Sequence, residues 1–172
     1  MSVLDTVRHR RSVRRYKAEA VPEDALARVL EAARLAPSAK NLQPWKFIVV
    51  REREAKEKLA EAAFGQTFMA EADLVIVACG FPDKAYPKQG RFMNSWPIDV
   101  TIAFEHLILQ AAEEGLGTCW IGAFEEAPVK ALLGVPDDVR VMAMTPLGWP
   151  AESPRDRGRK SLDEIVSYDR FR

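Results

Sequence analysis

The central part of the sequence reads Ile98-Asp-Val-Thr-Ile-Ala-Phe-Glu-His-Leu-Ile-Leu-Gln-Ala-Ala-Glu-Glu114. This run predicts a long helix whose apolar residues cover more than one stripe of its surface. A helix of that kind is central in its domain or buried at an interface. Gly115 and Gly117 follow it and are expected to end it. Such a helix favours a layered α+β fold over a regular doubly wound sheet.

Strands and shorter helices are predicted on both sides of this segment. The continuous apolar runs Lys46–Val50 and Leu74–Ala78 indicate strands that are covered on two faces. The other predicted elements are helices at Ser2–His9, from Pro22 as first helical residue to Pro37, at Glu52–Ala63, at Pro128–Leu133 and from Ser161 with Glu164 as its capping partner, and strands at Thr118–Ile121 and Val139–Leu147. Residues 81–97 have no period and suggest an irregular lid. We expect one domain over residues 1–172.

The composition gives the chain no overall electrostatic preference. Lysine and arginine total 25, and aspartate and glutamate also total 25. This balance argues against a nucleic-acid partner, and no apolar stretch approaches the ~20 residues that a membrane span needs. No apolar segment of signal-peptide form precedes Val3, so we expect a cytoplasmic protein. Cys79 and Cys119 lie in apolar runs at a spacing that suits neither zinc nor a redox pair, and we expect buried thiols.

The sequence lacks the motifs of the common protein-based chemistries. It contains no Walker loop, no His-Glu-x-x-His motif and no Gly-x-Ser-x-Gly elbow, and its only histidines are His9 and His106. Gly115-Leu-Gly117 begins like a dinucleotide fingerprint, but Trp120 occupies the position of the third glycine and the segment leads from a helix into a strand. A cofactor that the protein binds and tunes is therefore the expected source of chemistry.

Two cationic clusters stand out against the neutral background. The run Arg8-His-Arg-Arg-Ser-Val-Arg-Arg-Tyr-Lys17 carries the first, and Arg155, Arg157, Arg159 and Lys160 form the second. Guanidinium groups offer paired donors to phosphate oxygens, and a serine hydroxyl adds a compact donor. The two clusters are candidates for one phosphate site. A solvated helix end and a nucleic-acid contact are the alternatives that the residues leave open.

A polar loop is the third candidate for binding. It reads Ala36-Pro-Ser-Ala-Lys-Asn-Leu-Gln-Pro-Trp45. The amide side chains of Asn41 and Gln43 both donate and accept hydrogen bonds, as the edge of a heteroaromatic ring requires. Taken alone, the loop is equally compatible with an ordinary polar turn.

Three segments together resemble the nitroreductase-like family of FMN-dependent oxidoreductases. They are Arg10-Arg-Ser-Val-Arg-Arg-Tyr16, the loop Ala36–Trp45, and Gly115-Leu-Gly-Thr-Cys-Trp-Ile-Gly122, in the family's order. The resemblance spans nearly the whole chain and suggests a short-chain member. It implies an α+β fold with a central mixed, mainly antiparallel β-sheet flanked by helices. It also implies a domain-swapped homodimer with exchanged terminal segments and two FMN sites at the dimer interface.

The resemblance further implies which residues bind FMN. The phosphate, ribityl and pyrimidine side would be held by Arg10, Arg11 (largely through its backbone), Ser12 and Arg14, with Arg157 and Arg159 closing on the phosphate. The loop of the other subunit would contribute Pro37, Ser38, Ala39, Asn41 and Gln43. The backbone that approaches the flavin N5 would be that of Ile121, Gly122 and Ala123. Ala39 stands where many relatives have a hydroxyl residue.

The activity that the resemblance implies is a ping-pong transfer of hydride from NAD(P)H to FMN N5 and on to a small-molecule acceptor such as a nitroaromatic or a quinone. This chemistry requires neither a metal nor a protein nucleophile, which agrees with the missing motifs. Reductive dehalogenation or flavin degradation on the same scaffold is an alternative. A non-enzymatic flavin-binding module is another.

Overall fold

Four strands form one sheet at the centre of the fold. In the computed structural model, which describes residues 2–171, they are β1 (Trp45–Val50), β2 (Leu74–Gly80), β3 (Gly117–Thr118) and β4 (Arg140–Gly148). Their order in the sheet is β1-β2-β4-β3, and neighbouring strands run antiparallel. An isolated parallel bridge between Ser12 and Thr118 adds a parallel element at the β3 edge. The expected mixed, mainly antiparallel sheet is confirmed.

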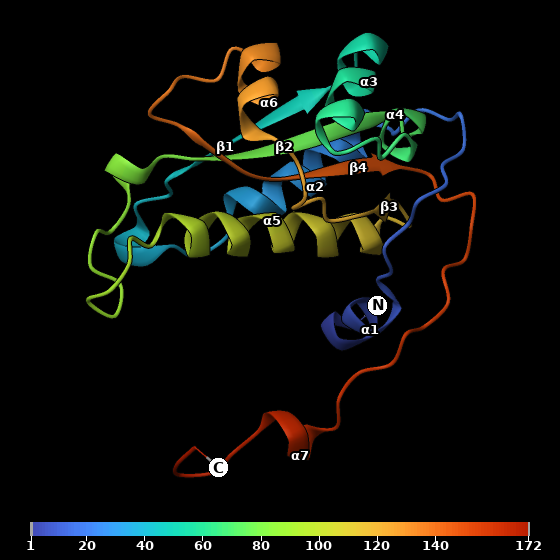
Figure 1. Cartoon of the computed structure of the whole chain (residues 1–172). Helices are drawn as coiled ribbons and strands as arrows, with labels where there is room; N and C mark the ends of the chain where they lie inside the picture. Colours follow the sequence, from blue (N-terminus) through green and yellow to red (C-terminus); the bar gives the residue numbers. More distant parts are fainter. Residues whose placement is uncertain (1, 172) are drawn as a thin grey trace.

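Helices cover both faces of this sheet (Figure 1). The helices on one face are α2 (Glu23–Arg34) and α5 (Trp96–Glu113), and those on the other are α3 (Arg53–Ala62), α4 (Phe68–Glu71) and α6 (Glu126–Leu133). Each face of the sheet therefore has its own apolar core. The arrangement is the layered α+β fold that the sequence predicts.

Strand β2 is buried on both faces, as its continuous apolar run predicts. Successive side chains of a strand point to opposite faces, so the strand divides its residues between the two cores. The α2 and α5 side receives Leu74, Ile76 and Ala78, and the α3 and α6 side receives Val75, Val77 and Cys79. The same prediction is wrong for β1. That strand pairs only with β2 at the edge of the sheet, and Val50 is its single fully buried residue.

Helix α5 is the long helix that the sequence predicts, and it packs into the centre of the fold. Phe104 on this helix is fully buried, with its ring centre 6.4 Å from that of Phe47 and 4.7 Å from that of Trp120. Gly115 has a φ of +77° directly after the helix. Glycine suits that left-handed position because it has no Cβ to clash. Gly115 therefore ends the helix as expected, whereas Gly117 begins strand β3, and the segment does not form a nucleotide loop.

Three local predictions differ from the structure. Pro22 caps α2 and is not its first helical residue. The segment Thr118–Ile121 is not one strand, because the Cys119 N–H donates to the Thr145 hydroxyl at 3.0 Å and Ile121 forms only an isolated bridge. Helix α4 was not expected, since a single turn is too short to show a helical period. The expected buried free thiols, Cys79 and Cys119, are confirmed.

Both ends of the described chain lie on the α5 side of the sheet (Figure 1). Helix α1 (Val3–His9) is attached by the Thr6 hydroxyl, which donates to the Glu113 carboxylate at 2.6 Å. After Pro150 the chain leaves the body and ends in α7 (Leu162–Ile165), which has the expected Ser161–Glu164 capping box. The large apolar side chains of this tail are exposed, namely Leu162, Ile165, Val166, Tyr168 and Phe171. Among the described residues, no helix combines the length and apolarity that a membrane crossing requires.

Lys56 anchors α3 to the turn between α4 and β2. Its buried side chain donates to the carbonyls of Ala72 and Asp73 at 2.5 and 2.9 Å. Lys56→Met preserves the length of the side chain and removes the donor, so we expect chemical denaturation to show a free energy of unfolding lower by about 1–3 kcal/mol. Lys58→Met, at an exposed position of the same helix that pairs with Glu54, should change it by less than about 0.5 kcal/mol. Equal losses in the two variants would contradict the anchoring role.

Candidate functional site

The two arginine clusters, which lie far apart in the sequence, meet in the fold. They line one cavity of about 340 Å³, which we call the arginine cavity and which is formed by Arg10, Arg11, Ser12, Arg14, Glu152, Pro154, Arg155, Arg157 and Arg159. Six of these residues are arginines and one is an acid. The structure thus brings together the residues that the sequence suggested for a phosphate.

The first cluster lies on an extended arm, residues 10–16, at the β3 edge of the sheet. Ser12 pairs with Thr118, and the Val13 N–H donates to the Thr118 carbonyl at 2.8 Å. The buried Val13 side chain occupies a notch at Gly117, where an added Cβ would lie 2.9 Å from it. The Tyr16 hydroxyl donates to the Val13 carbonyl at 2.7 Å. The side chains of the arm therefore project from a fixed backbone.

The second cluster reaches the arm because β4 ends beside it. The Ala151 N–H donates to the Arg15 carbonyl at 2.9 Å, and the Arg14 N–H donates to the Glu152 carboxylate at 2.6 Å. The tail therefore begins in contact with the arm. Its next residues carry Arg155, Arg157 and Arg159 past the arm and into the wall of the cavity.

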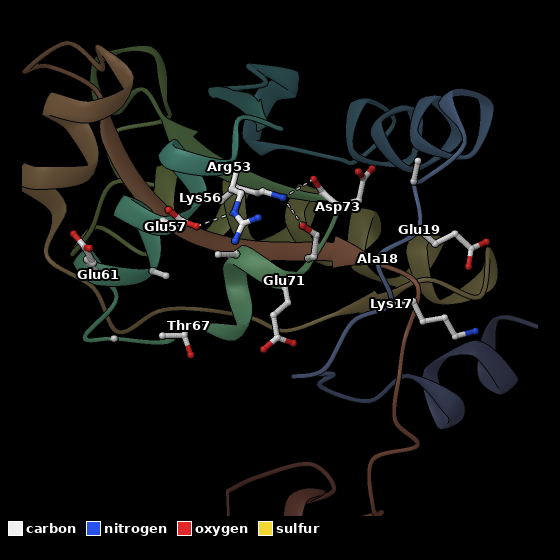
Figure 2. A pocket seen from close by; sticks show the side chains of 15 residues that line it. Lys17, Ala18, Glu19, Arg53, Lys56, Glu57, Glu61, Thr67, Glu71 and Asp73 are labelled. Atoms are coloured by element: carbon white, nitrogen blue, oxygen red, sulfur yellow. Dashed lines mark hydrogen bonds and ion pairs between the residues drawn. The ribbon is translucent and has the colours of Figure 1, made fainter.

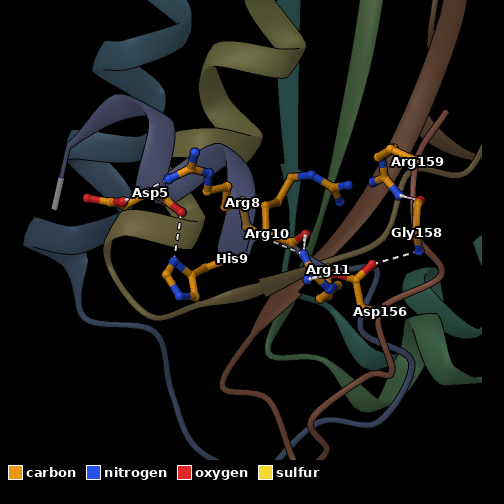
Figure 3. A network of polar contacts seen from close by, with 8 residues as sticks. All are labelled: Asp5, Arg8, His9, Arg10, Arg11, Asp156, Gly158 and Arg159. Carbon is orange, nitrogen blue, oxygen red and sulfur yellow. Dashed lines mark hydrogen bonds and ion pairs between the residues drawn. The ribbon is translucent and has the colours of Figure 1, made fainter. Parts of the chain in front are cut away.

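Arg11 differs from the other arginines because its guanidinium is already engaged (Figure 3). It forms an ion pair with Asp156 at 2.7 Å and donates to the carbonyls of Arg8 and Arg10. The Gly158 N–H and the Arg11 guanidinium hold the pKa of the Asp156 carboxyl below its usual range. This pairing agrees with the interpretation that Arg11 acts on a ligand largely through its backbone.

The other arginines of the arginine cavity form no ion pair within the described part of the chain. Within residues 2–171, Arg10, Arg14 and Arg157 have no carboxylate at ion-pair distance. Positive charges held close together repel one another, so a bound anion would lower the free energy of the site. The Ser12 hydroxyl adds a neutral donor to the wall. Burial raises the pKa of the Cys119 thiol behind Ser12, which keeps that thiol neutral near pH 7.

The residues 121–123 follow the arm's partner strand toward the solvent. Gly122 and Ala123 are exposed, and an added Cβ at Gly122 would lie no closer than 3.6 Å to Trp120. The packing of the chain itself therefore does not require glycine at this position. Thr118 and Gly122 are four residues apart, which is about 13 Å of extended chain. At most this length of chain separates Thr118, the partner of the arm, from the exposed backbone at Gly122.

The polar loop lies away from the arginine cavity, toward the other end of α5. The Ala39 N–H donates to Asp99 near the start of α5, whereas Arg10 and Arg11 also line a second, neighbouring cavity together with Ala112 near the end of that helix. Asp99 and Ala112 are 13 residues apart on this helix, or about 20 Å. One copy of the chain therefore does not bring Pro37, Ser38, Ala39, Asn41 and Gln43 to the arginine cavity.

Comparison with known proteins identifies the family of the chain. The model of the Nitroreductase family matches residues 7–68 and 63–149. The chain belongs to the nitroreductase family. An NADH dehydrogenase of Thermus thermophilus is 34% identical over 188 residues, with 92% of each chain covered. A nitroreductase family protein of Clostridium difficile is 30% identical with a TM-score of 0.90, and the match covers 99% of this chain and 100% of that one. An FMN-dependent nitroreductase of Clostridium difficile is also 30% identical, with a TM-score of 0.83, and the match covers 98% of this chain and 99% of that one.

Sequence reasoning missed two polar residues that this nitroreductase-family chain places beside the candidate site. Burial raises the pKa of the Glu105 carboxyl on α5, and the positive charge of Arg10 opposes that shift, which places Glu105 within electrostatic reach of the cavity. The Gln66 amide donates to the Ala123 carbonyl at 3.4 Å. Neither residue belongs to a motif. The signal for Glu105 was an acid in the middle of the long helix, among its apolar residues.

A larger cavity, of about 800 Å³, lies between α3, α4 and residues 17–20 (Figure 2). Its lining carries five carboxylates, Glu19, Glu57, Glu61, Glu71 and Asp73, and three cations, Lys17, Arg53 and Lys56. The Lys56 ammonium is already bonded to two carbonyls. The excess of acids disfavours a phosphate ligand. The smaller arginine cavity is therefore the better candidate for an anionic cofactor.

The position of the arm depends on the notch at Gly117. Gly117→Ala would place a Cβ 2.9 Å from Val13, so the arm must shift or the core must strain. We expect thermal or chemical unfolding to show a loss of about 1–3 kcal/mol. Gly122→Ala, with its nearest neighbour at 3.6 Å, is the matched control and should leave stability within about 0.5 kcal/mol. A neutral Gly117→Ala would mean that the arm is not held by this notch.

Proposed function

We propose that the protein is an NAD(P)H-dependent flavin oxidoreductase that binds the FMN phosphate in the arginine cavity. The observation that carries the proposal is the convergence of Arg10, Ser12 and Arg14 with Arg157 and Arg159 around one cavity. Membership of the nitroreductase family supports the same function. The names of the Thermus NADH dehydrogenase and of the Clostridium FMN-dependent nitroreductase support a nicotinamide donor and an FMN cofactor.

The residues of the cavity fit the phosphate of FMN. A phosphate monoester carries close to two negative charges near pH 7 and accepts hydrogen bonds from several directions. Arg10, Arg14 and Arg157 supply cations without carboxylate partners in the described chain, and Ser12 supplies a hydroxyl. The exposed backbone at Gly122 and Ala123, about 13 Å along the chain from Thr118, is the proposed neighbour of the flavin ring.

A second copy of the chain is proposed to complete the site. The polar loop that carries Asn41 and Gln43 is about 20 Å along α5 from the arginine cavity of its own chain, so it would reach the cofactor only across an interface. The exposed apolar side chains of the tail, such as Tyr168 and Phe171, also need a partner surface. Both features support the homodimer with exchanged terminal segments.

In this proposal the protein's own groups bind the cofactor and orient the substrates, and none of these groups takes part in a covalent step. When bound, FMN supplies the hydride-accepting centre that NAD(P)H and an acceptor such as a nitroaromatic or a quinone would use in turn. The arginine cavity fixes the phosphate end, and the segment 121–123 and the partner's loop would orient the ring and order the substrates against it. His9 and His106 are not required as acids or bases. The His9 ring is hydrogen-bonded to the Asp5 carbonyl at 2.7 Å.

The reaction class is tested by anaerobic reduction of the FMN-loaded protein. We expect NADH or NADPH to bleach the flavin absorbance, and menadione or nitrofurazone to restore it. A protein that takes up no FMN would exclude the proposal. Flavin that is bound but not bleached by either nicotinamide would indicate a non-enzymatic binding module, and turnover of halogenated substrates or of flavin itself would indicate the other reactions on this scaffold.

The phosphate assignment is tested by three arginine variants. Arg14→Ala and Arg159→Ala each remove a cation from the arginine cavity, and we expect the Kd for FMN to rise by about 10- to 100-fold because hydrogen bonds to charged groups contribute about 1.5–3 kcal/mol. Arg15 is exposed and outside the cavity, so Arg15→Ala should leave the Kd within about twofold. Flavin fluorescence quenching measures all three. Equal affinities would overturn the assignment.

A further inference from the structure

Two irregular segments meet at the start of α5. The polar loop, residues 38–43, and the excursion, residues 81–95, lie side by side near the N-terminal end of that helix (Figure 1). The Lys40 ammonium lies 5.0 Å from the ring centre of Tyr86, so the two segments also touch through their side chains. The sequence gives no sign of this contact, because residues 44–80, with strand β1, helices α3 and α4 and strand β2, separate the two segments.

Asp99 joins the two segments through a pair of hydrogen bonds. This aspartate is 3% exposed, and its Oδ1 accepts from the Ala39 N–H at 2.9 Å. Its Oδ2 accepts from the fully buried Ser95 hydroxyl at 2.7 Å. The Ser95 oxygen in turn accepts from the Tyr86 N–H at 3.0 Å, and the Ser95 N–H donates to the Tyr86 carbonyl at 2.8 Å. One buried carboxylate therefore holds the start of the polar loop and, through Ser95, the base of the excursion, where Tyr86 and Ser95 are hydrogen-bonded.

The loop adopts a conformation that needs such an anchor. Lys40, Asn41 and Gln43 have φ values of 52°, 57° and 50°, in the left-handed region that side-chain-bearing residues seldom adopt. Backbone of this kind persists where surrounding contacts over-determine it. Inside the loop, the Gln43 N–H donates to the Ser38 hydroxyl at 2.9 Å. The contact from Ala39 to Asp99 ties this shape to the rigid helix α5.

The excursion displays side chains that suit contact with a planar substrate. Its tip is a tight turn closed by the Gln89–Met93 bridge, with Phe92 81% exposed. The Lys84 ammonium lies 4.4 Å from the ring centre of Phe81. An exposed aromatic ring such as that of Phe92 can stack on another ring, provided that the hydrogen bonds at the base of the excursion hold the segment in one orientation.

We propose that Asp99 is a positioning residue that holds the polar loop and the excursion as one unit, so that the loop and the substrate-facing aromatic of the excursion are placed together. Its effect on turnover rests on the proposed function, in which the loop serves the flavin of a partner copy. Its effect on the structure does not. Because Asp99 lies about 20 Å along α5 from the arginine cavity, it acts on the orientation of substrate and leaves the phosphate contacts in place.

The test compares Asp99→Asn, Ser95→Ala and Asp83→Asn, by hydrogen exchange in the protein as purified and by kinetics in the FMN-loaded protein. Asp99→Asn leaves only a neutral amide oxygen to accept from Ala39, which is a weaker acceptor than the carboxylate, and its amide nitrogen replaces the acceptor of the Ser95 hydroxyl with a donor. Ser95→Ala keeps the contact between Asp99 and Ala39 and removes the hydroxyl that links Asp99 to the Tyr86 N–H. Asp83 is an exposed carboxylate of the excursion that takes no part in this network within the described residues, so Asp83→Asn is the matched control.

Hydrogen exchange read by mass spectrometry reports on the coupling itself. In Asp99→Asn, we expect peptides that cover 38–44 and 83–95 both to exchange about tenfold faster or more. In Ser95→Ala, we expect faster exchange in 83–95 and a smaller change in 38–44. Asp83→Asn should match the wild type. Faster exchange that is confined to 38–44 in Asp99→Asn, or an unchanged 83–95 in Ser95→Ala, would overturn the coupling.

Kinetics separate positioning from a loss of fold. We expect the KM for a quinone acceptor to rise about tenfold in Asp99→Asn, with the Kd for FMN rising less than in Arg14→Ala and kcat falling less than threefold. Coupled exchange with an unchanged KM would reduce Asp99 to a structural residue and overturn the positioning role. If the wild type binds no FMN, the proposed function fails while the exchange result still decides the coupling. If Asp99→Asn does not fold, Ser95→Ala alone decides it by exchange in 83–95 and by KM.

Discussion

The pairing of the arm with β3 is the constraint on which the candidate site depends. Ser12 pairs with Thr118, the Val13 N–H donates to the Thr118 carbonyl, and the Val13 side chain lies at Gly117, where a larger residue would not fit. This contact holds the N-terminal arginines against the edge of the sheet, and β4 ends beside them. The tail consequently starts next to the arm and brings its own arginines to the same place. The pairing thus holds together two cationic clusters that lie at opposite ends of the sequence.

The charge of the site follows from how these arginines are distributed. The chain as a whole is neutral, with most of its arginine ion pairs formed on the surface elsewhere, as between Arg28 and Glu114 or Arg140 and Glu126. Exposed pairs of this kind contribute little to stability and leave no unpaired charge for a ligand. In the arginine cavity, Asp156 engages Arg11 and leaves Arg10, Arg14 and Arg157 without a carboxylate partner in the described chain. A local excess of charge inside a balanced molecule would allow an anion to bind at this place without attracting nucleic acid or membranes to the whole surface.

The sequence predicted those parts of the fold that local patterns determine. The continuous apolar run of β2 and the long apolar helix carry their signal in adjacent residues, and both were found where expected. The arginine motif lines one cavity with the second cluster, and its role in binding a cofactor stays a prediction. The edge position of β1 could not be inferred, because it depends on which strands become neighbours. Asp99 was missed for the same reason. It is one acid within the first turns of an apolar helix, and its partners Ala39 and Ser95 come from two loops that only the tertiary structure brings together.

Helix α5 separates the two halves of the proposed site. Its first turns hold the polar loop through Asp99, and its last turns border the arm, about 20 Å away. A single chain therefore presents a cation-rich half-site at one end of the helix and a loop with an aromatic excursion at the other. Two copies placed so that unlike ends face each other would complete two sites at once, which is the geometry of a two-fold symmetric pair. In such a pair each cofactor would depend on both chains, so the rigidity of α5 and of its anchor at Asp99 would set the spacing between the phosphate contacts of one copy and the ring contacts of the other.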